Sequence, residues 1–413
     1  MLTTKACIVG AGPGGVATAL RLSYLGIPSV LIDKSSFPRD KICGDAISGK
    51  VTTLLNRLDP QILERFHDKS IQVDVWGIKF FAANGKAINI PFKPNYVKNA
   101  ASAPGYVSKR LDFDHFLVQE AQRRDNISFY DNKAIVNYER SEKGWLLTDD
   151  QGHQIDTQML FVADGAHSKF SRKVAGLEKS NLHHAAAVRA YFRNVKQLDA
   201  DNFIELHFIK SITPGYFWIF PLPNGQANVG LGMRSDILSK RKFNLRVELQ
   251  QLIQDHPSLK ERFAEAELIG GIQGYGLPLG SLKRTISGDH YMLIGDAGHL
   301  VDPLTGEGIG NAFYSGFIAA EQYQKCLEAN NFSGEFLKAY DVRVDRVLGS
   351  EMRLSYRLQK MLMYPWVVNI LASIIASNKK VLDVLSGMYN DFALREQLAK
   401  PIFWLKMAFK KGR

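Results

Sequence analysis

The N-terminal segment constrains the fold of this 413-residue chain more than any other part of it. An apolar run at residues 6–9 leads directly into Gly-Ala-Gly-Pro-Gly-Gly at residues 10–15, and an Ala- and Leu-rich helical stretch continues to Leu25. After Gly26, a second apolar run ends at Asp33. This order predicts a strand, a glycine turn, a helix and a second strand, which is the βαβ unit of an α/β fold.

Each part of this unit suits a dinucleotide. The glycines permit a tight turn and a close approach of a pyrophosphate, and the start of the helix offers free N–H groups and the positive end of its dipole. Asp33, eighteen residues after Gly15, can accept hydrogen bonds from ribose hydroxyls. A glycine turn with a purely structural role is the alternative, and this segment alone leaves the dinucleotide open. The predicted cofactor residues here are Gly10, Gly12, Pro13, Gly14, Gly15, Asp33 and Lys34.

Two later segments carry Gly and Asp after apolar runs. The first contains Asp164-Gly165, and the second contains Gly295-Asp296 followed by a glycine-rich stretch at residues 306–310. An isolated Gly-Asp pair is often an ordinary turn at the end of a strand. In this order, however, the three segments resemble those of the flavoprotein hydroxylase superfamily. The resemblance implies FAD, with Asp164-Gly165 near the nucleotide and pyrophosphate and Gly295-Asp296 at the ribityl chain.

The same resemblance adds residues around the flavin. In that superfamily an arginine before a helix, matched here by Arg110, contacts the phosphate and ribityl region. Asp296 can accept hydrogen bonds from polyol hydroxyls, and the glycine-rich stretch ahead of the next helix offers N–H donors near the isoalloxazine carbonyls. The predicted cofactor residues in this stretch are Gly306, Gly308 and Ile309.

Two further stretches are similar to the geranylgeranyl reductase branch of that superfamily. Residues 39–45, Arg-Asp-Lys-Ile-Cys-Gly-Asp, match its Lys-x-Cys-Gly segment, which places Cys43 and Gly44 at the cofactor. Residues 214–221 and 228–232 are similar to its YxWxFP and NVGxG stretches. The resemblance covers roughly residues 5–345. It implies a reductase that saturates carbon–carbon double bonds of an isoprenoid, either a prenyl lipid, a quinone or a prenyl diphosphate.

The resemblance also indicates where substrate and proton would meet. Tyr216, Trp218 and Phe220 alternate along a strand, so they share one face, and with Pro221 they are the predicted substrate-binding residues. The alternative is that they form the core of a second sheet. Cys43 and Tyr216 are candidate catalytic proton donors, although a small buried thiol is an equally good interpretation of Cys43. Because no second glycine fingerprint follows a strand, NAD(P)H or another reductant is expected to bind only transiently.

The strand pattern changes character twice along the chain. Alternating and aromatic strands with an Asn-Gly turn occupy residues 73–90, and strands dominate again at residues 185–233. We therefore predict an α/β fold in which an FAD-binding Rossmann-like domain is interleaved with an antiparallel β-sheet substrate domain and followed by a helical C-terminal region. The expected ranges are 1–70, 106–180 and 280–345 for the first, 71–105 and 181–279 for the second, and 346–413 for the third.

Composition limits the cellular setting. Three widely spaced cysteines argue against a disulfide framework or a thiolate metal site, so we expect a cytoplasmic protein without a metal. Nearly half of the net charge of +11 lies in residues 400–413, which contain five basic residues and no acidic one. With Ile402, Leu405 and Phe409 on one helical side, this tail is predicted to contact the inner face of an anionic membrane peripherally. Packing of the tail on the protein's own core is the alternative. The expected partner is a hydrophobic or lipid substrate, with no nucleic acid.

Two rival functions stay open at this point. The Trp-Ile-Phe-Pro stretch at residues 218–221 is also similar to the WxWxIP stretch of flavin halogenases, which favours a flavin-dependent monooxygenase or halogenase. A halogenase requires a lysine beside its substrate, and the sequence alone assigns none. The second rival is a non-catalytic FAD-binding electron-transfer protein, against which the aromatic and Cys-Gly stretches argue.

Overall fold

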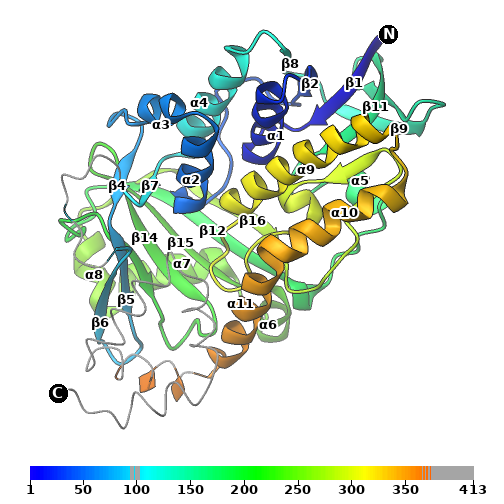
Figure 1. Cartoon of the computed structure of the whole chain (residues 1–413). Coiled ribbons are helices and arrows are strands. Elements are labelled where there is room, and N and C mark those ends of the chain that lie inside the picture. Colours follow the sequence, from blue (N-terminus) through cyan, green and yellow to red (C-terminus); the bar gives the residue numbers. More distant parts are fainter. Residues whose placement is uncertain (94–96, 98–102, 365, 368, 371–372, 374–413) are drawn as a thin grey trace, which may run out of the picture.

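The computed structural model describes residues 1–93, 97, 103–364, 366–367, 369–370 and 373, and within them the strands form two large sheets and one small one (Figure 1). Strands β18, β11, β1, β2 and β8 of the larger sheet are parallel neighbours, as expected of repeated βαβ connections. Its spatial order is β17 (Ser287–Gly288), β18 (Tyr291–Leu293), β11 (Gln154–Val162), β1 (Leu2–Val9), β2 (Ser29–Ile32) and β8 (Ile127–Tyr130), with β10 (Trp145–Asp149) beside β11 and β9 (Ile135–Arg140) beside β10.

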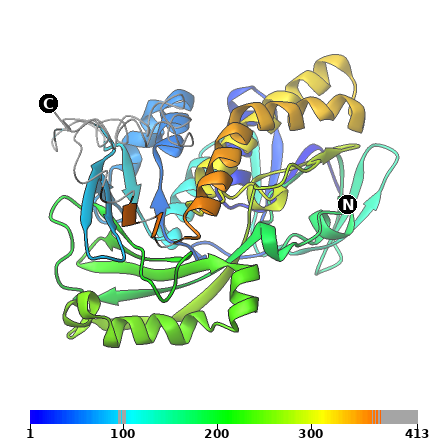
Figure 2. The same cartoon turned by 90° about the horizontal axis from the view of Figure 1, so that it is seen from below.

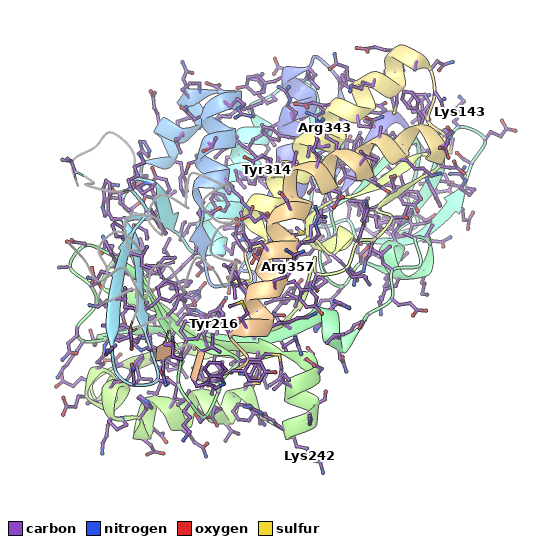
Figure 3. All side chains as sticks on the ribbon, turned by 60° about the horizontal axis from the view of Figure 1, so that its bottom comes forward. Lys143, Tyr216, Lys242, Tyr314, Arg343 and Arg357 are labelled. Carbon is purple, nitrogen blue, oxygen red and sulfur yellow. The ribbon has the colours of Figure 1, made fainter. Side chains whose placement is uncertain are left out.

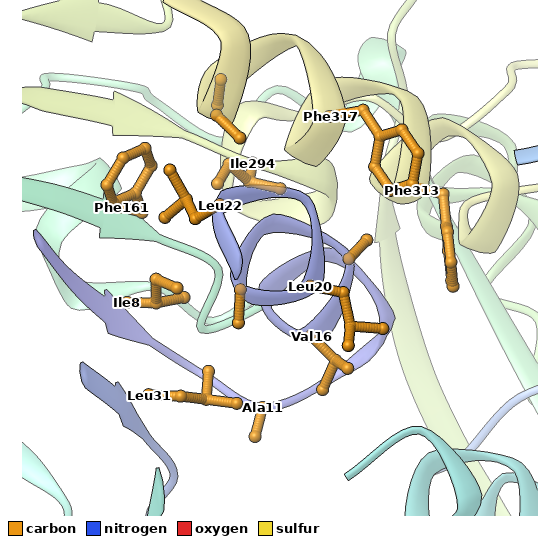
Figure 4. Packing of buried hydrophobic residues seen from close by; sticks show 14 of the residues in the cluster. Ile8, Ala11, Val16, Leu20, Leu22, Leu31, Phe161, Ile294, Phe313 and Phe317 are labelled. Atoms are coloured by element: carbon orange, nitrogen blue, oxygen red, sulfur yellow. The ribbon is translucent and has the colours of Figure 1, made fainter. Parts of the chain in front are cut away.

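Strand β1 lies in the middle of this sheet, and both of its faces are covered. Ala6, Cys7 and Ile8 have no exposed surface, as expected for a strand of a buried parallel sheet. Helices α1 (Pro13–Tyr24) and α9 (Ile309–Ala329) pack against each other beside it. Figure 4 shows α1 between strand residues such as Ile8 and the α9 residues Phe313 and Phe317.

The remaining helices extend this first layer (Figure 1). Helix α10 packs on α9 and passes through one π turn, Asp345–Gly349, into α11, which descends toward the second large sheet. The elements are α2 (Gly49–Leu58), α3 (Pro60–Phe66), α4 (Arg110–Gln122), α5 (Lys169–Lys173), α10 (Gly334–Val344), α11 (Ser350–Met361) and the 3₁₀ turns Asn181–His183 and Gly295–Gly298.

The second large sheet has seven strands, and its neighbouring pairs are antiparallel except for the parallel pair of β13 and β5. Helices α7 and α8 cover one face, where they pack on Phe217 and Ile219 (Figure 2). The spatial order is β16 (Glu267–Pro278), β12 (His184–Arg193), β15 (Gln226–Arg234), β14 (Tyr216–Leu222), β13 (Ile204–His207), β5 (Gly77–Phe81) and β6 (Ala87–Pro91); the helices nearby are α6 (Ser235–Arg241), α7 (Leu245–Asp255) and α8 (Pro257–Phe263).

A small sheet lies between these two layers. It pairs β3 (Ala46–Ile47) and β4 (Val73–Val75) with the central β7 (Gly105–Val107). The interleaving predicted from the strand pattern is therefore present, because residues 77–91 join a sheet whose other strands span residues 184–278. The predicted fold class is confirmed, including the helical segment after residue 346, while the domain boundaries stay a prediction. The basic tail at residues 400–413 lies outside the described residues.

Within the described ranges, no helix combines the length and the apolar character that crossing a lipid bilayer requires.

Candidate active site

A cavity of about 1800 Å³ lies between the carboxyl ends of the parallel strands and the inner face of the seven-stranded sheet. Its volume exceeds the roughly 300–1,000 Å³ of a typical small-molecule pocket, so it has room for a large cofactor and a second ligand. With the exception of Gly15 and Pro221, every predicted site residue lines it: Gly10, Gly12, Pro13, Gly14, Asp33, Lys34, Cys43, Gly44, Arg110, Asp164, Gly165, Tyr216, Trp218, Phe220, Gly295, Asp296, Gly306, Gly308 and Ile309.

The glycines of the first turn have separate physical reasons. A Cβ on Gly10, which has φ +106°, would lie 2.4 Å from the Ala163 carbonyl oxygen, and one on Gly15 would lie 1.7 Å from the Gly10 oxygen. Gly14 packs closely on Ile294. Gly12 differs, because the nearest atom to its added Cβ would be Arg39 Nη2 at 3.9 Å. Three glycines thus close the turn, whereas Gly12 leaves space in the cavity wall.

The start of α1 and the end of β2 together form a polar cradle. No side chain caps α1 at Gly12, so its first N–H groups remain available to an anion. Asp33 accepts hydrogen bonds from the Ala11 N–H at 2.7 Å and the Ser35 N–H at 2.8 Å. These bonds fix the orientation of the carboxylate, whose remaining lone pairs can accept from ribose hydroxyls.

Asp164 continues this polar edge at the end of β11. Its Oδ1 is buried and has no hydrogen-bond partner among the described residues. Burial raises the pKa of Asp164 to about 6, against hydrogen bonds from Ser168 and its own backbone N–H and the nearby Lys34. A buried acceptor without a partner is costly, and a hydroxyl-bearing ligand would satisfy it.

Two arginines and one aspartate hold the wall opposite the glycine turn. Arg110 makes a bidentate ion pair with Asp114, with distances of 2.6 and 2.7 Å, and Arg39 Nη1 contacts the same carboxylate at 2.6 Å. Burial opposes the charge of Arg110, but Asp114 raises its pKa overall, and its guanidinium also contacts the Cys43 side chain. Arg39 stacks on Phe37, with 4.8 Å to the ring centroid. The charge of Arg110 is therefore held where a pyrophosphate is expected, and Arg39 contacts the same carboxylate.

Asp296 stands in a 3₁₀ turn directly after β18 and faces a lysine that our sequence analysis did not assign. Lys41 Nζ lies 3.9 Å from Asp296 Oδ2 and 4.3 Å from the centroid of the Tyr275 ring. Burial lowers the pKa of Lys41, while Asp296 acts in the opposite direction. The signal was present in the sequence, since Lys41 belongs to the Lys-x-Cys-Gly stretch.

The loop before α9 connects the cofactor residues to the aromatic strand. Gly306 has φ +73°, and a Cβ on Gly308 would lie 3.1 Å from Asp296 Oδ1. The Tyr216 hydroxyl donates to the Thr305 carbonyl at 2.7 Å. Burial raises the pKa of Tyr216 well above its usual value. Tyr216 therefore holds the loop against β14 and is a weak acid there.

The two other aromatic residues on the cavity face of β14, Trp218 and Phe220, have two roles. Trp218 and Phe220 are nearly buried and pack with core residues of the inner face, and both also line the cavity. The two interpretations of these residues are thus compatible. Pro221 is buried but does not line the cavity, because alternation turns it to the other face of the strand.

Cys43 and Gly44 lie on a loop pressed against this strand. A Cβ on Gly44 would be 3.3 Å from the Phe220 ring, and Cys43 is partly buried and lines the cavity. Asn228 Nδ2 donates to the Cys43 carbonyl and to Asp45 Oδ2, each at 2.8 Å. Our sequence analysis quoted Asn228 and Asp45 within motifs but did not select them, since their roles depend on a contact between distant segments.

These features fit an FAD: an open glycine cradle, an uncapped helix start, acceptors for ribose and ribityl hydroxyls, and charged arginines beside the pyrophosphate position. Among the residues that the structure describes, no group of three or more His, Cys, Asp or Glu side chains could hold a metal ion.

The space at Gly12 gives a specific prediction for cofactor binding. In Gly12→Ala, the new methyl group meets no protein atom closer than 3.9 Å, so the thermal midpoint of the apoprotein should change little. The same methyl group occupies the space where the pyrophosphate approaches the backbone, so FAD affinity should fall about tenfold or more, equivalent to about 1.4 kcal/mol. Fluorescence titration of apoprotein with FAD measures this. An unchanged affinity would show that the pyrophosphate lies elsewhere.

Comparison with known proteins identifies the family. The profile described as an FAD binding domain matches residues 3–322. The chain is 28% identical to a digeranylgeranylglycerophospholipid reductase of Thermoplasma acidophilum, over 83% of each protein. It is 30% identical to a menaquinone reductase of Mycobacterium tuberculosis, over 76% of this chain and 75% of that protein.

Solved structures agree with these sequence relatives. A geranylgeranyl bacteriochlorophyll reductase-like protein of Thermoplasma acidophilum superposes with a TM-score of 0.81 at 25% identity, over 100% of this chain and 97% of that one. A flavin-dependent brominase superposes with a TM-score of 0.74 at 21% identity, over 96% and 98%, which shows the shared fold alone. The predicted resemblance is confirmed: the chain belongs to the FAD binding domain family and is an FAD-dependent oxidoreductase of the geranylgeranyl reductase type.

Proposed function

We propose that this protein saturates carbon–carbon double bonds of an isoprenoid chain, in a prenyl lipid, a quinone or a prenyl diphosphate. The observation that carries the proposal is one continuous cavity in which the cofactor residues open into a region of apolar side chains. An extended hydrocarbon needs such a slot, because its affinity comes from burying apolar surface rather than from hydrogen bonds. The relatives named for reduction of geranylgeranyl lipids and menaquinone support this substrate class.

We call this region the apolar arm. One wall is the inner face of the seven-stranded sheet and the other is α11, which lies over that face near Tyr216 in Figure 3. Gln359 holds α11 to the loop before α9 by donating to the Pro303 carbonyl at 2.5 Å. The apolar arm is lined by Ile78, Phe80, Phe92, Ile204, Leu206, Phe208, Leu354, Leu358, Leu362 and Met363.

When bound and reduced, FAD supplies a hydride to one carbon of the double bond. The residues of this chain have the other tasks: Trp218 and Phe220 position the chain, and the apolar arm excludes water. Cys43 is a candidate proton donor because it lines the cavity between the cofactor residues and the aromatic strand. Tyr216 suits positioning better, since its hydroxyl proton is donated to Thr305. NAD(P)H or another reductant would deliver the electrons transiently.

Rival functions need the same fold but different chemistry. A halogenase requires a lysine free to meet its substrate, and six lysines line the cavity: Lys34, Lys41, Lys50, Lys93, Lys133 and Lys169. Lys50 Nζ is held by Glu351 at 2.9 Å, Asn311 at 2.9 Å and Glu307 at 3.3 Å. Lys41 is paired with Asp296 and Tyr275 on the cofactor side. Lys41 and Lys50 are thus held by ion-pair partners, whereas the exposed Lys93 directly follows Phe92 of the apolar arm, so the reaction with substrate decides between reductase and halogenase.

An anaerobic half-reaction separates the three functions. The bound flavin is reduced chemically, a polyprenyl substrate is added without oxygen, and flavin absorbance and product mass are followed. We expect flavin reoxidation and a product heavier by two hydrogen atoms. Turnover that needs oxygen and adds an oxygen atom would establish a monooxygenase instead. No substrate-dependent reoxidation under either condition would leave only electron transfer.

The width of the apolar arm gives a prediction about chain length. Leu206 lines the cavity from β13, and Leu206→Trp should block the arm and lower kcat/KM for a long polyprenyl chain by about tenfold or more. A substrate with a single prenyl unit should lose much less. Leu268→Trp is the matched control, because Leu268 is 45% exposed on β16 and outside the cavity lining. Equal losses for long and short chains would show that the substrate does not run past Leu206.

We also propose that the protein is cytoplasmic and meets its substrate at the inner face of the membrane through residues 400–413. The support is the sequence of this tail, with five basic residues, no acid and apolar residues at helical spacing. Deletion of residues 400–413 should weaken binding to vesicles that contain anionic lipid, measured by co-sedimentation, and high salt should do the same to the full chain. Equal sedimentation of the full and shortened chains would refute the contact.

A further inference from the structure

Asp45 is a buried acid in the cavity wall that none of the roles above uses. Its side chain is 0% exposed, yet Asp45 is among the residues that line the cavity. Oδ2 accepts hydrogen bonds from the Tyr191 hydroxyl and from Asn228 Nδ2, each at 2.8 Å. Oδ1 has no hydrogen-bond partner among the residues described. Half of this carboxyl group is therefore held firmly, and the other half is left free to exchange a proton.

The hydrogen bonds around Asp45 connect it to the residues nearest the reaction. Asn228, which donates to Asp45, also donates to the Cys43 carbonyl at 2.8 Å and accepts from Trp218 Nε1 at 2.9 Å. The backbone of Asp45 has φ +68°, and its carbonyl accepts from the Ser108 N–H at 3.0 Å. Asp45 thus has a fixed position between Cys43 and the aromatic strand β14.

The charges that face Asp45 do not form an ion pair with it. Arg189, on β12, is paired with Asp40, and Arg110, on α4, is paired with Asp114. Burial raises the pKa of Asp45 to about 7, while the hydrogen bonds from Asn228 and Tyr191 and the charges of Arg189 and Arg110 act against it. A large fraction of the carboxyl group is therefore neutral at physiological pH.

We propose that Asp45 holds the proton that completes the reduction of the double bond and releases it through Oδ1. This inference rests on the proposed function. One carbon takes a hydride, with both electrons, from the reduced flavin, and the other carbon takes the proton, so the alkene gains two hydrogens and the flavin is oxidised. Because Asp45 has no exposed surface, the proton reaches the carbon through one intervening group, a water molecule or the Cys43 thiol. The carboxylate left behind is stabilised by Tyr191 and Asn228 and regains a proton from solvent.

The proton store is tested first without cofactor or substrate. The protonated-carboxyl region of the infrared spectrum should contain a component that titrates near pH 7, separate from that of Asp164 near 6, and this component should be lost in Asp45→Asn. Asp112→Asn is the control, because Asp112 lies on α4 outside the cavity lining, and this variant should keep the band. If the spectra of Asp45→Asn and the unaltered protein agree in this region, Asp45 is ionised and the proposal fails.

The reaction itself supplies the second test. With reduced holoenzyme and a polyprenyl substrate under anaerobic conditions, Asp45→Asn should slow flavin reoxidation by about 10²- to 10⁴-fold, the usual contribution of a general acid. The unaltered protein should lose rate as pH rises through about 7, because the neutral acid is then lost. Asp112→Asn should keep both the rate and the midpoint. An unchanged rate and pH profile in Asp45→Asn would overturn the role.

Tyr191→Phe separates proton storage from simple anchoring and also serves if Asp45→Asn does not fold. Removal of the hydroxyl takes away one donor to the carboxylate, so the midpoint of the pH profile should move upward. A purely structural bond would change the rate but leave the midpoint in place, and that result would contradict the proposal. If the unaltered protein shows no alkene-dependent reoxidation, the proposed function fails, while the infrared band still decides whether Asp45 stores a proton.

Discussion

The close contact between the turn after β1 and the end of β11 is the constraint on which the site depends. Any side chain at Gly10 would overlap the Ala163 carbonyl, and any at Gly15 would overlap Gly10 itself, so backbone meets backbone here without intervening atoms. This contact brings Asp33 and Asp164 to one edge of the sheet, although they are 131 positions apart in the sequence. Gly14 brings the end of β18 to the same place by packing on Ile294. The carboxylates that can accept from one dinucleotide are thus brought together because the glycines of this turn have no side chains.

A second constraint joins this edge to the inner face of the other sheet. Asn228 uses both donors of its amide on the loop of residues 43–45 and its oxygen on Trp218. Tyr216, on the same strand as Trp218, donates a hydrogen bond to the loop before α9. Hydrogen bonds of this kind contribute about 0.5–1.5 kcal/mol each, more where a charge takes part, and a buried partner left unpaired costs more than the bond contributes. The aromatic strand therefore cannot shift without exposing unpaired polar groups on the cofactor side.

Local pattern was sufficient for the parts of the site that depend on neighbours in the chain. The βαβ unit follows from periodicity and glycine spacing, and the aromatic face of β14 follows from alternation. The parallel pairing of β5 with β13 did not follow, because residues 77–81 and 204–207 meet only in the folded sheet. Lys41 and Asp45 belong to the motif stretch at residues 39–45 but were not selected, because their burial depends on residues that are distant in the sequence. Pro221 lies outside the cavity lining because β14 alternates, a consequence already available from the sequence.

Burial then links the substrate to the ionisation of the site. The apolar arm that would take a hydrocarbon chain also removes water from the groups around it, and this disfavours every charged form nearby. The pKa values of Asp45 and Tyr216 rise and that of Lys41 falls for the same reason, with burial as the largest cause in each case. The charge of Arg110 is held by the carboxylate of Asp114, which also contacts Arg39 on the cofactor side, and that of Lys50 is held by Glu307 and Glu351. The cavity therefore keeps paired charges where a pyrophosphate would bind, while burial favours the neutral form of Asp45 where an alkene would react.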